Sequence, residues 1–127
     1  MADEEGSQVL ATLEDYVTTG YRYGEDPETG EDGHNFDQRD LESTMGHLVA
    51  DAWLWAGNNN PAGLSADIGM VNSGGLRDEF PGGLRQDITT EIGEITVADA
   101  VGVNPFANDI FTTDITGAQL RETLEQQ

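Results

Sequence analysis

One stretch of helical periodicity, between residues 43 and 57, constrains the fold of this chain most strongly. Its apolar residues recur every three or four positions, as on one face of a helix: Met45, Leu48, Val49, Ala52 and Ala56. Ser43 is a good N-cap residue, and Gly57 is a typical stop signal. We therefore predict a helix over residues 43–57. Trp53 and Trp55 cannot both lie at the centre of this face, so one packs at its edge, and both are expected in core or interdomain contacts.

Two apolar runs in the second half of the chain predict strands. The run "ADIGMVN" (66–72) is short, lies between turn signals and reads as a buried strand. The run "DIFTTDI" (109–115) alternates as a strand does. Nearer the N-terminus, "TTGYRY" (18–23) is a further candidate strand.

Three more helices are predicted from periodicity and capping signals. Residues 7–17 place Val9, Leu10, Leu13 and Val17 near one face, which indicates a short amphipathic helix. Thr96 with Asp99 precedes "VADAVGV", and Thr116 with Gln119 forms a capping box before the last helix, in which Leu120 and Leu124 share a face.

The order of these elements indicates the fold class. Helices and strands alternate and no internal repeat is present, so we predict an α/β or α+β protein with a mixed sheet. At 127 residues the chain suits one structural domain. Within it, residues 1–38 hold a helix, a strand and an acidic, glycine-rich loop, and residues 39–127 hold the remaining elements.

Charge limits the partners that the chain can have. It has 25 acidic and five basic residues, a net charge of −20, no lysine and no cysteine. Nucleic acid is excluded as a partner because its phosphates need basic side chains. A surface this acidic repels itself at low salt, which favours a halophilic source and a high-salt environment; an acidic mesophilic protein is the alternative. No apolar stretch is long enough to span a membrane, and "MADEEGSQ" lacks the features of a secretory signal, so the compartment stays unknown.

The predicted strand 66–72 ends in a candidate binding turn. Asn72 is followed by Ser73, Gly74 and Gly75, whose small side chains let a ligand approach the backbone and whose N–H groups can face an anion. Arg77 comes next and offers a planar fork for carboxylate or vicinal oxygens. The alternative is a tight surface turn in which Arg77 forms an ordinary ion pair.

Other candidates are weaker when taken singly. Arg39 stands before the predicted helix, where a cation is disfavoured unless an anion lies nearby; pairing with a neighbouring acid is the alternative. Phe106, in "NPFAND", could stack on a planar base if exposed or belong to the core if buried. His34 and His47 have no partner at motif spacing, and the acidic loop departs from calcium-loop spacing, so no metal site and no catalytic residue is predicted.

Three blocks, "RDLESTMGHLVADAWLW", "ADIGMVNSGGLRDEFPGG" and "GEITVADAVGVNPFANDIFTTDITGAQLRETLEQ", resemble in order and spacing the C-terminal domain of the 5'-nucleotidase family. The resemblance runs from Arg39 to the chain end. It implies a mixed α/β sandwich, of which this chain is the first half. It also implies a nucleotide- or UDP-sugar-binding domain that serves a separate metallophosphoesterase domain, where the divalent metals and catalytic residues lie.

The resemblance assigns roles to particular positions. Arg39 and Arg77 match arginines that contact the substrate, Asn72 and Asn108 match asparagines of the same pocket, and Phe106 matches one of two aromatic residues that sandwich the base. Gly74 and Gly75 have no side chains, so the ligand can approach the backbone closely. Asn35 stands where some members of the family have a further arginine, Ala107 stands where the family commonly has glycine, and the second aromatic residue has no counterpart here.

Two readings of the whole chain follow. In the first, it is part of a halophilic 5'-nucleotidase-type hydrolase that binds nucleotide weakly and hydrolyses nothing by itself, with or without a partner chain that carries the metals. In the second, it is a non-catalytic ligand-binding or protein-interaction module, and an open sheet edge favours a homodimer.

Overall fold

The structure is a computed structural model, and it describes residues 5–15, 17–19, 24–25, 32–33, 41–61, 63–78, 80 and 93–126. Its helices and strands, in chain order, are β1 (Val9–Thr12), β2 (Gly24–Glu25), β3 (Asp32–Gly33), α2 (Thr44–Asn58), the 3₁₀ turn η1 (Ser73–Gly75), β4 (Glu94–Thr96), α3 (Val97–Val103) and α4 (Gly117–Glu125). The strands form two antiparallel pairs, β1 with β4 and β2 with β3. Helices with a small antiparallel sheet confirm the α+β class, although the described residues form no mixed sheet.

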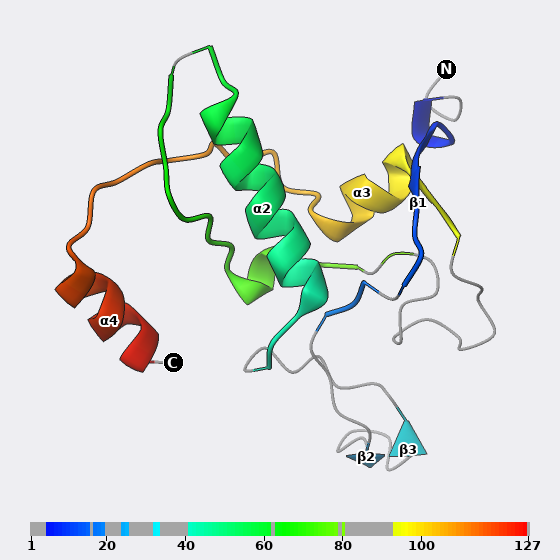
Figure 1. Cartoon of the computed structure of the whole chain (residues 1–127). Helices are drawn as coiled ribbons and strands as arrows, with labels where there is room; N and C mark the ends of the chain where they lie inside the picture. The colour runs from blue at the N-terminus through cyan, green and yellow to red at the C-terminus, as the bar shows by residue number, and fades with distance from the viewer. Residues whose placement is uncertain are drawn as a thin grey trace.

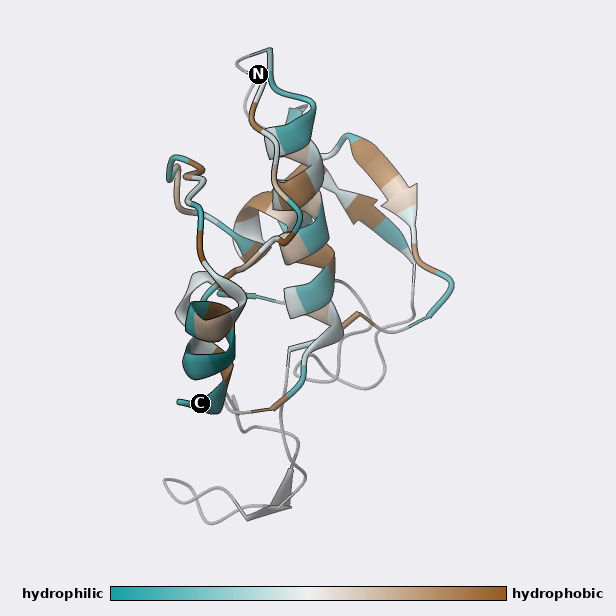
Figure 2. Cartoon of the chain, turned by 60° about the vertical axis from the view of Figure 1, so that its left-hand side comes forward, coloured by the Kyte–Doolittle hydropathy of each residue, from teal (hydrophilic) through white to brown (hydrophobic). Residues whose placement is uncertain are grey.

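Helix α2 is the central element, and it confirms the prediction for residues 43–57 to within one residue at either end (Figure 1). The Ser43 hydroxyl accepts a hydrogen bond from the Gly46 N–H at 2.9 Å, which satisfies a backbone donor of the first turn. The helix carries both hydrophobic and hydrophilic residues along its length, as an amphipathic helix does (Figure 2). Within it, Met45 and Val49 are buried and Leu48 is exposed.

The chain segment around Thr18 is bonded to the start of α2. The Thr18 carbonyl accepts hydrogen bonds from the Met45 N–H at 3.0 Å and from the hydroxyls of Ser43 and Thr44 at 3.1 and 3.3 Å. The Thr18 N–H donates to the Thr44 hydroxyl at 2.9 Å. A residue far from α2 in sequence therefore satisfies donors at its N-terminus. The predicted strand 18–23 is not formed at Thr18 and Thr19, and its other residues lie outside the described ones.

The prediction of a helix over residues 7–17 is wrong. Residues Val9–Thr12 form β1, which pairs with β4 in antiparallel register, with an irregularity between Val9 and Ala11. The Val97 N–H donates to the Gln8 carbonyl and the Leu13 N–H to the Gly93 carbonyl, both at 3.0 Å, and these bonds extend the pairing at each end. Pairing with β4 satisfies the backbone of a segment too short to make a stable helix alone.

Helices α3 and α4 begin as predicted. Thr96 and Asp99 form a complete capping box at α3, and Thr116 and Gln119 form one at α4. The two helices differ in environment: α3 buries Val103, whereas α4 buries no residue and lies to one side of α2, beyond residues 63–72 (Figure 1). No helix among the described residues is long and apolar enough to cross a membrane.

The core is small and lies where α2, α3 and the chain after η1 meet. Its buried apolar members are Met45, Val49, Leu76, Phe80, Ile95 and Val103, with Leu13, Val17, Trp53 and Val71 packed against them. Trp53 thus contacts the core as predicted. Trp55 is 69% exposed and does not belong to the core, because α2 turns it away from the side that carries Met45 and Val49; an interdomain contact of Trp55 stays a prediction.

The predicted strands 66–72 and 109–115 are not formed among the described residues. Both segments lack regular secondary structure, and Ile68, Met70 and Ile115 are about half exposed. Residues 66–72 lie along α2 in the direction opposite to it (Figure 1). Gly69 faces the helix so closely that a Cβ atom there would lie 2.3 Å from the Ala50 carbonyl oxygen. Apolar and polar residues do alternate in the sequence of these segments, but no strand among the described residues pairs with them to form a sheet.

Candidate functional site

The predicted binding turn is the short 3₁₀ turn η1 (Ser73–Gly75). The Gly75 N–H donates to the Asn72 carbonyl at 2.8 Å, and the Leu76 N–H donates to the Ser73 carbonyl at 3.1 Å. The prediction that the Gly75 N–H faces an anion is therefore wrong, because the turn itself uses this donor. Gly75 is buried, and a Cβ atom there would lie 3.2 Å from the Asn72 side-chain oxygen. The glycine is needed for close packing inside the turn.

The turn is fastened to the C-terminal end of α3. The Arg77 N–H donates to the Val103 carbonyl at 2.8 Å, and the Asn104 side-chain amide donates to the Gly75 carbonyl at 3.2 Å. Gly102 packs against Asp78, whose carboxylate oxygen would lie 3.3 Å from a Cβ atom at that glycine. These contacts bring together two segments that lie 29 residues apart at the Gly75–Asn104 bond.

Four predicted site residues present their side chains to solvent around this junction: Asn72, Arg77, Phe106 and Asn108. Phe106 is 47% exposed, so the alternative that it belongs to the core is wrong. The Asn108 N–H donates to the Phe106 carbonyl at 2.8 Å, which bends the chain tightly just after the ring. Among the described residues, Arg121 forms an ion pair with Glu125 and His47 lies 3.6 Å from Glu42, and neither contact involves Arg77.

One predicted site residue cannot be placed, and the others line no described cavity. Arg39 lies outside the described residues. The two described cavities lie elsewhere, between residues 65–70 and residues 109–117, and no predicted site residue lines them. The predicted residues thus stand on an open surface. The role of each residue stays a prediction.

Asn104 makes a structural contact at the turn that sequence reasoning missed. It follows the last residue of α3 and joins that helix end to the binding turn through its side chain. Asparagine directly after a helix is a frequent cap residue, so its position was a usable signal. Its partner, the Gly75 carbonyl, is remote in sequence and could not be read from the local pattern.

Acidic side chains do not gather into a metal site in the part of the chain that the structure describes. No three His, Asp or Glu side chains there come close enough to hold an ion together. The expectation that divalent metals belong to a separate domain stays a prediction.

Comparison with known proteins identifies the class to which these features belong. Residues 22–127 match the family model described as 5'-nucleotidase, C-terminal domain. The match covers most of the chain, and the chain therefore belongs to this family, as the three sequence blocks predict.

Three curated relatives fit this assignment. The chain is 36% identical to the cell wall protein Lmo0130 of Listeria monocytogenes over 69% of its length and 34% identical to the trifunctional nucleotide phosphoesterase protein YfkN of Bacillus subtilis over 75%. It is 39% identical to a 5'-nucleotidase of Vibrio vulnificus over 46%. The matched regions cover 10%, 6% and 9% of these relatives, so the chain spans a tenth of their length or less. No solved structure matches the chain.

Proposed function

We propose that this chain is the nucleotide- or nucleoside-binding part of a 5'-nucleotidase-type hydrolase, acting on a nucleoside phosphate or a UDP-sugar. In this proposal the Arg77 guanidinium donates to oxygens of the ligand and Phe106 stacks on its base. Asn72 and Asn108 supply amide groups that hydrogen-bond to the ligand. Arg39 adds a second cation.

The observation that carries the proposal is the fastening of the turn to α3. The bond from the Arg77 N–H to the Val103 carbonyl and the bond from the Asn104 side-chain amide to the Gly75 carbonyl hold the two segments against each other. The Arg77 and Phe106 side chains leave the backbone near these bonds and remain exposed. A rigid backbone that carries an exposed cation and an exposed ring suits a ligand with an anionic part and a flat part.

The proposal assigns binding to this chain and chemistry to another. The phosphoesterase metals and the catalytic residues would belong to a metallophosphoesterase domain or chain, which brings the scissile phosphate to its metals. The chain alone is then expected to bind ligand without hydrolysing it. Its affinity is expected to be weak, because a ring that stacks on one side contributes only part of about 1–3 kcal/mol per base.

The test is a calorimetric titration of AMP into the wild-type chain and three variants, in about 1 M KCl so that surface charge is screened. Arg77→Ala is expected to weaken binding about tenfold or more, because a charge-assisted hydrogen bond contributes about 1.5–3 kcal/mol. Phe106→Leu keeps an apolar side chain but removes the stacking surface, and it is also expected to weaken binding.

Arg121→Ala is the matched control. Arg121 is an exposed arginine on α4 whose side chain bonds to Glu125 at 2.7 Å, so its loss removes the same charge far from the turn. The control should bind AMP as the wild type does. Equal affinities of Arg77→Ala and Arg121→Ala would sink the proposal, and a titration of adenosine would show whether Arg77 contacts the phosphate or the nucleoside.

A non-catalytic interaction module is a second candidate function, and one observation favours it. Ile68, Met70, Phe111 and Ile115 are exposed apolar residues on the two segments that were predicted to be strands. Exposed apolar side chains gathered on one side of a small protein are typical of an interaction surface.

A further inference from the structure

Asn59 and Asn104 hold the same position in their helices, each directly after the last helical residue. The Asn59 side-chain amide donates back to its own helix, to the Trp55 carbonyl at 2.8 Å. The Asn104 side-chain amide instead donates to the Gly75 carbonyl of η1 at 3.2 Å, 29 residues earlier in the chain. The Asn104 backbone N–H stays with α3 and donates to the Ala100 carbonyl at 3.3 Å. Asn104 is therefore bonded both to α3 and to the turn.

The bond between Asn104 and Gly75 lies close to the proposed cation and to the proposed ring. Gly75 precedes Arg77 by two residues, and Asn104 precedes Phe106 by two. Pro105 removes much of the freedom between Asn104 and the ring, because proline fixes its own φ and restricts the backbone of the residue before it. Asn104 accordingly has φ −133° and ψ 80°, outside the helical region. The backbone position of Phe106 thus follows from that of Asn104.

A second bond joins the same two segments and shows what the first one adds. The Arg77 N–H donates to the carbonyl of Val103, the neighbour of Asn104, at 2.8 Å. One hydrogen bond leaves two segments free to turn about it, whereas two bonds at different points fix their relative orientation. Loss of the Asn104 amide should therefore let the turn rotate against α3 without detaching it.

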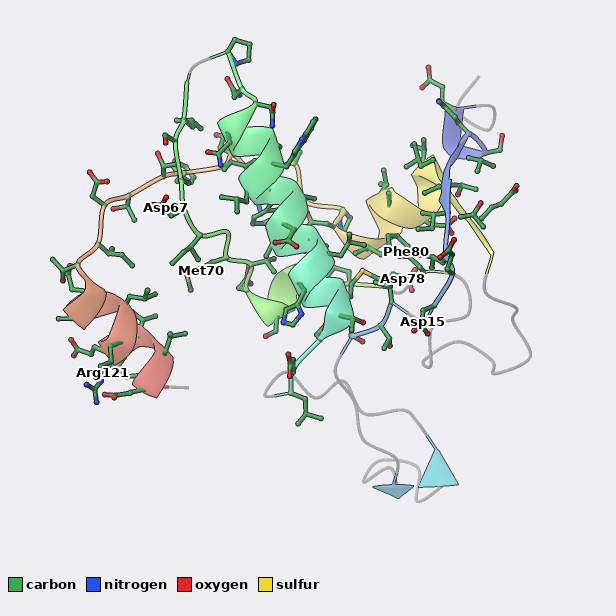
Figure 3. The ribbon with its side chains drawn as sticks, viewed as in Figure 1. Asp15, Asp67, Met70, Asp78, Phe80 and Arg121 are labelled. Carbon is green, nitrogen blue, oxygen red and sulfur yellow. The ribbon has the colours of Figure 1, made fainter. Side chains whose placement is uncertain are left out.

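The remaining contacts of the turn do not depend on Asn104. Leu76 and Val103 are 7% and 2% exposed and belong to the same core. A Cβ atom at Gly102 of α3 would lie 3.3 Å from the Asp78 carboxylate oxygen, so the chain after the turn passes close to the helix. Figure 3 shows Asp78 and Phe80 on the side of α2 where α3 lies. A variant at Asn104 is therefore expected to fold.

We propose that Asn104 is a positioning residue for ligand binding, an inference that rests on the function proposed above. Its side-chain amide fixes the orientation of η1 relative to α3 and thereby the separation of the Arg77 guanidinium from the Phe106 ring. Asn104 itself does not contact the ligand. A ligand that must reach both groups at once binds more tightly when their separation is already set, because binding then does not have to order them.

A positioning residue has an effect only while the residue that it positions is present. Without the Arg77 side chain there is no cation to hold at a fixed distance from the ring, so loss of the Asn104 amide should weaken binding no further. A residue that only stabilises the fold, or that contacts the ligand independently, would weaken binding by the same factor with and without Arg77. Combining the two substitutions therefore separates these roles.

The test is a calorimetric titration of AMP, in about 1 M KCl, into variants of the full chain. Asn104→Ala and Asn104→Leu are each made in the wild type and in Arg77→Ala. Leucine is similar in size to asparagine but has no donor, so it separates loss of the bond from loss of volume. Asn59→Ala is the matched control, because it removes a side-chain amide bond at the end of α2. Thermal unfolding by circular dichroism verifies that each variant is folded at the temperature of the titration.

Both substitutions of Asn104 are expected to weaken AMP binding about threefold to tenfold, the usual effect of having to order a side chain on binding. In Arg77→Ala the same substitutions are expected to change the affinity by less than about twofold, which is within the error of additivity. Asn59→Ala should bind AMP as the wild type does.

An equal loss of affinity with and without Arg77 would overturn the inference, because Asn104 would then act through stability or through a contact of its own. Wild-type affinity in Asn104→Ala and Asn104→Leu, with weak binding in Arg77→Ala, would also overturn it and would leave the proposed function standing. Wild-type affinity in Arg77→Ala, or no binding of AMP to the wild type, would overturn the proposed function and this inference together.

Discussion

Gly69 is the residue at which one added carbon would disturb the most structure. A Cβ atom there would lie 2.3 Å from the Ala50 carbonyl oxygen and 3.1 Å from the Leu54 Cβ atom. Both contacts are with α2, and the nearer one is with its backbone, which cannot rotate away as a side chain can. The extended segment and the helix would have to move apart.

We predict that Gly69→Ala lowers the free energy of unfolding by about 1–3 kcal/mol, the usual cost of overpacking. The measurement is chemical denaturation followed by circular dichroism. Gly117→Ala is the control: nothing lies within 4 Å of its added Cβ atom, and alanine suits the first turn of α4 better than glycine. A Gly69→Ala protein as stable as Gly117→Ala would show that residues 66–72 do not rest on α2 as described.

At the scale of the element, α3 and α4 begin with the same device in different surroundings. In α3 the Thr96 N–H donates to the Asp99 carboxylate at 2.7 Å, and in α4 the Thr116 N–H donates to the Gln119 side-chain oxygen at 2.8 Å. Helix α3 is tied to the core through Val103, whereas α4 buries no residue. Loss of the cap should therefore have a global effect in α3 and a local one in α4.

Thr96→Ala is expected to lower the free energy of global unfolding by about 1 kcal/mol, the typical contribution of an N-cap side chain. Thr116→Ala is expected to speed amide hydrogen exchange in residues 117–125 while leaving the denaturation midpoint nearly unchanged. Equal shifts of the midpoint in the two variants would contradict the view that α4 adds little to the core.

The same comparison shows how far sequence reasoning reaches. Ser43, Thr96 and Thr116 were found because a cap depends on residues three positions apart. The strand β1 was read as a helix because its partner, β4, lies more than 80 residues away, and short apolar runs fit either structure. Residues 66–72 and 109–115 alternate as strands do, yet alternation states which side chains share a face and does not supply a neighbouring strand.

The candidate site likewise has features that the sequence predicts and features that depend on the folded structure. Arg77 and Phe106 could be chosen from their residue types and from the family resemblance, and both are exposed in the structure. The bond between Asn104 and Gly75 and the use of the Gly75 N–H inside its own turn depend on the folded geometry. No local pattern could have shown that the glycine donor is taken.

At the scale of the whole molecule, charge dominates. A net charge of −20 on 127 residues places many carboxylates within a Debye length of one another at low salt. Among the contacts of the described residues, the ion pair of Arg121 with Glu125 at 2.7 Å offsets a little of this charge. Repulsion between the surface carboxylates therefore opposes folding, and only a small apolar core stabilises the folded state against it.

We predict that the melting temperature rises steeply between about 0.1 and 1 M KCl, over which the Debye length falls from about 10 to 3 Å. The measurement is thermal unfolding by circular dichroism at several KCl concentrations. A halophilic origin requires this rise, whereas a melting temperature that is flat or falling over the range would favour an acidic mesophilic protein.

The hydrogen bonds that join Thr18 to the start of α2 have a practical consequence. The family match begins at residue 22, so a protein engineer guided by homology alone would discard everything before it. Such a trimmed version would lose the partner strand of β4, the apolar contacts of Leu13 and Val17, and the carbonyl that receives donors from Ser43, Thr44 and Met45. The leading residues are part of the folding unit, and expression designs should retain them.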